Sequence, residues 1–254
     1  MGSAVADDLS FTVTSAASPN VGIAPDSLVT IRGNKIATQP ASATEIPWPI
    51  RLGDMPGVLI TDAANRSREA GLLYVAPPQM NIWIPPDTAV GEGKIGFAVT
   101  GLGLGLGAAA LRSMPVTFAR VAPGLFSIDG SGAGTAAATA IRVVISSGGR
   151  GVVPVFHCDA PANCAAVPID VGVDAPVYLS LYGTGIRGVS SLSNVSVNIG
   201  DKKFPALYAG PQTIIPGLDQ INLALPLDLR GAGLVNVSVT VDGVTSNAVQ
   251  IRIQ

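Results

Sequence analysis

The chain has 254 residues, of which 48% are hydrophobic and 13% are charged, and its formal net charge is −2. This balance excludes the basic face that nucleic-acid binding needs, and no apolar run approaches the roughly 18 residues of a membrane-spanning helix. Thirty glycines and twenty prolines interrupt the chain, which excludes long helices and favours short strands joined by turns.

Short strands are predicted along the first half of the chain. Each is bounded by Gly, Pro, Asn or Asp, the residues that favour turns. The predicted strands are 10–14, 28–32, 58–61, 71–75, 80–84, 94–100 and 114–120.

Two tryptophans in this half are candidate contacts for a ligand or partner. Trp48 lies between two prolines in a predicted loop, where it either packs against the body or is exposed for binding. Trp83 has the opposite parity to Ile82 and Ile84, which places it on the second face or at the edge of the predicted sandwich.

The Leu-Gly alternation at 101–107 is a third candidate contact. In an extended segment, Leu102, Leu104 and Leu106 point to one side. We expect an apolar flap that contacts a partner subunit or a lipid surface, with folding back onto the core as the alternative.

The second half is predicted to follow a linker near 120–132. The stretch 135–168 has no counterpart in the first half and can add a hairpin. Alternating Val with Asn, Ser and Thr over 235–241 is typical of a half-buried antiparallel strand. The predicted strands are 140–145, 177–182, 193–199, 203–209, 220–224, 234–241 and 248–253.

Cys158 and Cys164 are predicted to form a disulfide that closes a short loop in an oxidising compartment. The alternative is two free thiols in a cytosolic protein. Because no second Cys/His pair and no calcium-loop motif is present, we expect no metal and no cofactor, with a loop calcium site built from backbone oxygens as the alternative. The only histidine, His157, lacks a nucleophile elbow nearby, so we expect a partly exposed loop residue and no catalytic residue.

Three segments recur in the same order in the two halves. Such a repeat predicts two related units, an all-β fold of two tandem immunoglobulin-like β-sandwich domains at 8–125 and 126–254. The pairs are 27–37 with 176–188, 72–87 with 206–228, and 91–101 with 231–243.

Several motifs together resemble a known family. IAPDSLVTIRG (23–33), LLYVAPPQMNIWIP (72–85), VAPGLF (121–126), ALYAGP (206–211) and the closing VTVDGVTSNAVQIRIQ (239–254) resemble the C-terminal domain common in secreted proteins of Solibacter and other Acidobacteria. The second-half motifs also look like the TIG (IPT) branch of immunoglobulin-like domains. The resemblance implies a secreted or cell-surface location and assigns no activity.

The expected function is therefore that of a non-catalytic extracellular module for structural support, self-association or adhesion. Its expected partners are a second copy, through edge strands such as 8–14, or a cell-surface polysaccharide. A carbohydrate-binding accessory module is the first alternative, and a hydrolase is the second.

Overall fold

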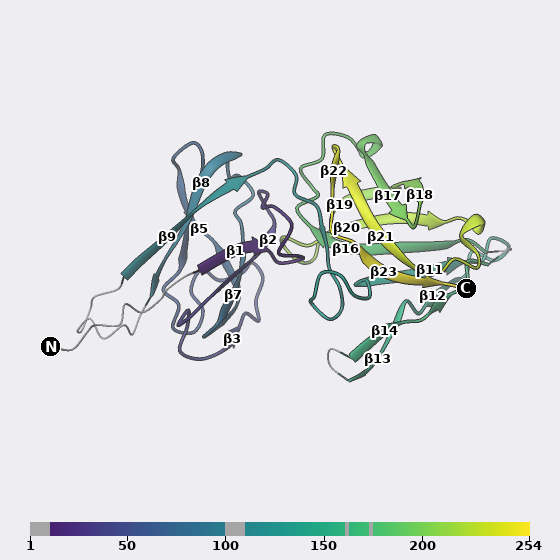
Figure 1. Ribbon diagram of the computed structural model, residues 1–254, viewed down its shortest axis with the longest axis horizontal. Coiled ribbons are helices and arrows are strands. Elements are labelled where there is room, and N and C mark those ends of the chain that lie inside the picture. The colour runs from purple at the N-terminus through teal and green to yellow at the C-terminus, as the bar shows by residue number, and fades with distance from the viewer. Residues whose placement is uncertain (1–10, 100–109, 161–162, 173–174) are drawn as a thin grey trace.

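The computed structural model describes residues 11–99, 110–160, 163–172 and 175–254 (Figure 1). Strands dominate this part of the chain, and its only helical segments are two three-residue 3-10 turns, η1 (Leu192–Asn194) and η2 (Leu227–Leu229). No helix in these ranges is long and apolar enough to cross a bilayer. The all-β prediction is confirmed.

The N-terminal half forms two antiparallel sheets. The first contains, in spatial order, β1 (Phe11–Ser15), β2 (Leu28–Gly33), β7 (Gln79–Trp83), β6 (Gly71–Ala76) and β3 (Ala41–Ser42). The second contains β5 (Ser67–Glu69), β4 (Val58–Thr61), β8 (Gly91–Val99) and β9 (Ala110–Phe118).

The C-terminal half also contains two large sheets. One has the order β12 (Arg150–Val153), β11 (Ala138–Val143), β16 (Val177–Thr184), β20 (Asp219–Leu225) and β19 (Tyr208–Pro211), and β10 (Gly124–Leu125) also pairs with β16. The other has β15 (Pro168–Ile169), β23 (Val249–Ile253), β21 (Gly233–Val241), β17 (Val195–Ile199) and β18 (Lys202–Pro205), with β22 (Val244–Thr245) on β21.

Each pair of sheets encloses its own apolar core. Side chains alternate across a strand, so one parity of each strand is buried between the sheets, as in the valines of β21. The first cluster joins residues such as Val29 and Ile82 to Ile60 and Phe97 of the opposite sheet. The second cluster joins the two C-terminal sheets and includes Val121 and Leu125 from the segment between the halves. The division at 125/126 stays a prediction.

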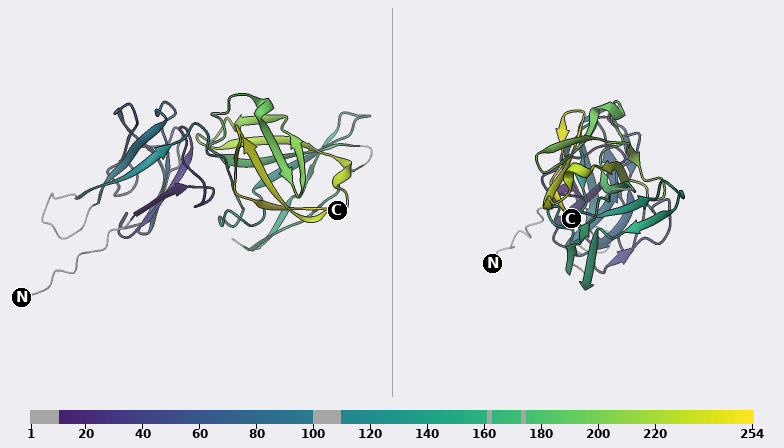
Figure 2. Two further views of the ribbon diagram at one scale, coloured as in Figure 1. Left: turned by 45° about the horizontal axis from the view of Figure 1, so that its top comes forward. Right: turned by 90° about the vertical axis from the view of Figure 1, so that its right-hand side faces the viewer.

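The two sandwiches lie end to end along the long axis of the molecule (Figures 1 and 2). Their strand neighbours correspond: β2-β7-β6 in the first matches β16-β20-β19 in the second, and β5-β4-β8-β9 matches β18-β17-β21-β23. The three repeated sequence segments fall on these matching strands.

One strand prediction was wrong. Residues 203–209 were expected to form a single strand, but β18 ends at Pro205 and β19 begins at Tyr208 in the other sheet. The chain changes sheets between them, and the burial pattern breaks there, because Leu207 and Tyr208 are both exposed.

The strands β13 (Phe156–Ala160) and β14 (Asn163–Ala166) form a separate antiparallel pair, and among the described strands they pair only with each other. Cys158 and Cys164 are directly opposite in this pair and are joined by a disulfide. The disulfide prediction is confirmed.

Candidate functional site

Arg187 joins the two sandwiches. It follows β16 in a turn, and its Nη1 donates to Asp26 Oδ2 of the first sandwich at 2.6 Å. Its Nε donates to Asp219 Oδ1 at 2.7 Å, and its Nη2 donates to the Leu218 carbonyl at 2.7 Å. A planar guanidinium is suited to such a fork, because its donors point in fixed directions.

The charges of this junction are largely removed from water. The exposed fraction of the side chain is 13% for Arg187, 20% for Asp26 and zero for Asp219. Burial raises the pKa of the Asp219 carboxyl, against the opposing charge of Arg187 and the N–H of Ile186. Burial also acts to lower the pKa of Arg187, but the two carboxylates outweigh it and the net shift is upward.

The loop before β20 packs against both tryptophans of the first sandwich. Trp48 Nε1 donates to the Pro216 carbonyl at 3.2 Å, and Trp83 Nε1 donates to Asp26 Oδ1 at 2.6 Å. A Cβ on Gly217 would lie 2.9 Å from Trp83 Cδ1, so the backbone approaches the indole as closely as glycine allows. Both indoles are half-buried. Their predicted role toward an external ligand stays a prediction, and what the structure shows is contact between the two sandwiches.

Thr184 completes the junction. Its Oγ1 accepts from the Leu28 N–H at 2.8 Å and donates to the Gly217 carbonyl at 2.7 Å, and the whole residue is buried. A hydroxyl that is both donor and acceptor is fully used here, which leaves neither backbone group unpaired.

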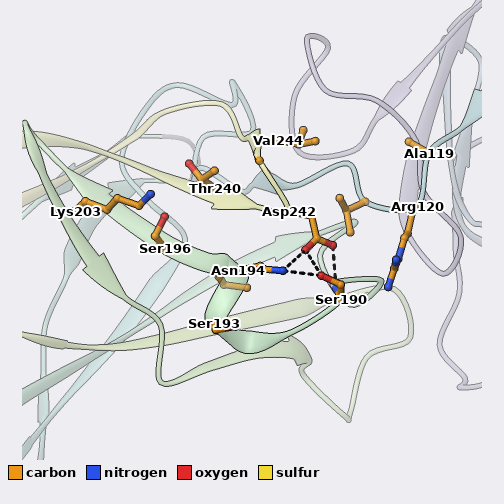
Figure 3. A pocket seen from close by; sticks show the side chains of 13 residues that line it. Ala119, Arg120, Ser190, Ser193, Asn194, Ser196, Lys203, Thr240, Asp242 and Val244 are labelled. Atoms are coloured by element: carbon orange, nitrogen blue, oxygen red, sulfur yellow. Dashed lines mark hydrogen bonds between the residues drawn. The ribbon is translucent and has the colours of Figure 1, made fainter.

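A polar groove of about 810 Å3 lies beside this junction (Figure 3). Its walls are formed by the linker at 119–121, the turn at 190–194, the outer side of β17 and β18, and the turn between β21 and β22. The polar lining side chains are Arg120, Ser190, Ser193, Asn194, Ser196, Lys203, Thr240 and Asp242.

Asp242 organises one wall of the groove. Its carboxylate accepts from the Ser190 N–H at 2.9 Å, from the Ser190 hydroxyl, and from Asn194 Nδ2 at 3.2 Å (Figure 3). The Ser190 hydroxyl and N–H lower the pKa of Asp242, and Arg120 adds a smaller effect. The carboxylate is therefore ionised at neutral pH.

The chemistry of this cluster favours binding. The Ser190 hydroxyl donates to Asp242 and accepts from Asn194 Nδ2 at 2.8 Å, so its hydrogen bonds hold the two turns together. The hydroxyls of Ser193, Ser196 and Thr240 and the ammonium of Lys203 line the remainder. Such a lining suits a polar, hydroxyl-rich or carboxylate-bearing ligand.

The remaining predicted residues lie elsewhere. His157 is on the exposed β13, its side chain is 72% exposed, and its Nε2 lies 3.1 Å from Asp159 Oδ1. Because Cys158 is in the disulfide, it provides no thiolate nucleophile beside that histidine. Leu102, Leu104 and Leu106 lie outside the described residues. Within the described ranges, no three His, Cys, Asp or Glu side chains form a set that could hold a metal.

Sequence reasoning missed the junction and the groove. Arg187 is 161 positions from Asp26, and Ser190 is 52 positions from Asp242, so no local spacing relates them. The one available signal was the matching of β2 with β16, because Asp26 and Arg187 flank these two equivalent strands.

No family model matches the sequence, and no curated protein matches it. The resemblance to the secreted Solibacter and TIG families therefore stays a prediction.

Proposed function

We propose that this chain is a non-catalytic structural module of a secreted or cell-surface protein, in which two sandwiches act as one stiff unit. The observation that carries the proposal is the Arg187 fork between Asp26 and Asp219. Sandwiches joined by a linker are expected to move relative to each other unless their interface is well ordered. Here a buried ion pair, the Trp48 indole hydrogen bond and the Thr184 hydroxyl all cross the interface.

The extracellular location is supported by the disulfide. Cys158 and Cys164 lie on an exposed hairpin, where a reducing compartment would open the bond. The similarity to secreted family members, read from the sequence motifs, supports the same location.

A distance measurement between the sandwiches tests the stiffness. Leu59 of β4 is 43% exposed and Leu234 of β21 is 47% exposed, so Leu59→Cys and Leu234→Cys are suitable for spin labels under non-reducing conditions. We expect a single narrow distance distribution by pulsed electron resonance. A broad distribution in the otherwise unchanged chain would contradict the proposal.

Self-association is part of this proposal and is supported by the free edges of the sheets. β12 is an edge strand, and Val152 on it is 84% exposed. Exposed apolar edge strands favour pairing with another chain. Light scattering at rising concentration tests this. A particle mass that grows with concentration for the unmodified chain and stays constant for Val152→Lys supports edge pairing. A strict monomer at every concentration refutes it.

Contact with a cell-surface polysaccharide is a second proposal. It is favoured by the hydroxyl, amide and charged lining of the groove, whose volume of about 810 Å3 is within the usual range for small-molecule sites. Affinity electrophoresis in gels containing polysaccharides is the test, and unretarded migration in every gel would end it.

A further inference from the structure

The outer face of the β11–β16–β20–β19 sheet has an unusual composition. The inward residues of these strands, such as Leu179 and Leu223, are buried in the core. The opposite parity therefore faces outward. On these four strands the outward residues include Thr139, Ile141, Tyr178, Ser180, Tyr182, Tyr208, Gln220, Asn222 and Ala224, all of them uncharged, and the charged Arg150 lies outward at the β12 edge of the same sheet, opposite Val143.

The strand register arranges the three tyrosines around a polar centre. Ser180 is opposite Asn222, and Asn222 is opposite Tyr208 on the edge strand. Tyr178 and Tyr182 flank Ser180 on β16, about 13 Å apart for four residues of extended chain. Tyr208 is two strands from Ser180, roughly 10 Å away.

The Tyr208 side chain lies along its own strand, β19. A Cβ on Gly210 would be 3.2 Å from the Tyr208 hydroxyl oxygen and 3.4 Å from its Cζ, and the hydroxyl donates to the Pro211 carbonyl at 2.6 Å. The side chain thus follows its own strand over Gly210, and the residue remains 38% exposed.

The polar centre keeps open hydrogen-bonding groups. Gln220 Nε2 donates to Asn222 Oδ1 at 2.7 Å and to Ser180 Oγ at 3.4 Å. The Tyr182 hydroxyl pairs with Thr139 at 3.0 Å. Within the described residues, Gln220 Oε1, Asn222 Nδ2 and the Tyr178 hydroxyl have no hydrogen-bond partner, which leaves an acceptor, a donor and a phenol in one small area.

We propose that this tyrosine–amide face binds a neutral polysaccharide. The C–H edges of sugar rings would lie on the tyrosine rings, and their hydroxyls would pair with Gln220 Oε1 and Asn222 Nδ2. The uncharged face complements an uncharged polymer, whereas the groove of Figure 3 carries Arg120, Lys203 and Asp242. The inference rests on the proposal of a polysaccharide ligand, and it replaces the groove with this face as the binding surface.

The test is affinity electrophoresis of the intact chain in gels containing mixed-linkage β-glucan, galactomannan or polygalacturonate. The variants are Tyr178→Ala, Tyr208→Ala and Asn222→Ala. Asn236→Ala is the matched control, because Asn236 is an amide on the outer side of β21, in the opposite sheet and outside the groove lining. Circular dichroism and thermal melting check that each variant is folded.

We expect retardation by a neutral polymer and an apparent affinity about tenfold weaker in Tyr178→Ala and Tyr208→Ala, which corresponds to about 1.4 kcal/mol. Asn236→Ala should bind as the unmodified chain does, and Tyr178→Phe should retain binding because it keeps the ring. Retention that survives in all three face variants would overturn the assignment of this face while leaving polysaccharide contact intact.

No retardation of the unmodified chain in any gel would overturn both proposals. Retardation by polygalacturonate alone would also overturn this one, since it would indicate the charged groove. A dimer that Tyr178→Ala dissociates, without glycan binding, would show that a second copy covers the face and would likewise overturn it.

Discussion

Replacing Arg187 with Ala is the most direct perturbation of the junction. The change removes three side-chain hydrogen bonds and leaves Asp219, which has no exposed side-chain surface, without its counter-charge. Removing one partner of a buried ion pair costs about 3–5 kcal/mol, and we expect the lower end, about 3 kcal/mol, since Asp26 is partly exposed. The stability of Arg187→Lys should lie between those of the unmodified chain and Arg187→Ala, because one ammonium cannot bridge both carboxylates as the guanidinium fork does.

Calorimetry and urea unfolding measure this loss. The single transition expected for the unmodified chain should move down and separate into two as the sandwiches uncouple. Arg51→Ala is the control, because the Arg51–Glu69 pair has exposed fractions of 56% and 38% and contributes below about 1 kcal/mol. Equal stability of the Arg187→Ala and Arg51→Ala proteins would refute the reasoning.

The pH dependence of the Arg187→Ala deficit gives a second readout. Burial raises the pKa of Asp219, and the charge of Arg187 opposes that shift, so its loss raises the pKa further. A carboxyl with a raised folded-state pKa costs stability as pH rises, because the unfolded chain releases its proton first. The deficit should therefore be largest at neutral pH and should shrink toward the ordinary aspartate value of 3.8.

Three further perturbations have defined outcomes. Gly217→Ala should lower the melting temperature because φ is +86° and the new Cβ overlaps the first sandwich, whereas Gly243→Ala, at φ +83° with nothing within 4 Å, should cost only the backbone strain; equal losses would contradict the proposed close packing. Reduction of Cys158–Cys164 should expose the hairpin to proteolysis and leave the main melting transition in place, because β13 and β14 pair only with each other; a large fall in the main transition would disprove that independence. The hydrogen bond from the Ala89 N–H is the main cause that holds the pKa of Asp62 well below 3.8, so Asp62 contributes stability that is present above that pH and lost below it. In urea unfolding, the stability of Asp62→Asn should therefore depend less on acid pH than that of the unmodified chain. An unchanged dependence would count against this role.

Strand content and the disulfide could be read from the sequence. The alternation in 235–241 reports burial of every second residue, which is a local property of extended chain, and β21 occupies those positions. Cys158 and Cys164 are six residues apart, so their pairing could also be predicted from the local sequence. The repeated segments also predicted which strands of the two halves correspond, because each repeat unit must bury its own apolar face.

The candidate sites depended on the tertiary structure. A short, mostly apolar run such as 203–209 fits either one strand or the ends of two strands in different sheets, so the crossing after Pro205 was not visible. The tyrosine–amide face likewise requires the register of three strands, which places residues from β16, β20 and β19 in one row.

Sequence periodicity therefore determined which side of each strand is apolar, since that is set within a few residues by backbone geometry. Only the fold determined which distant side chains meet, as Asp26 and Arg187 do, because that follows from how sheets pair and how the two sandwiches pack.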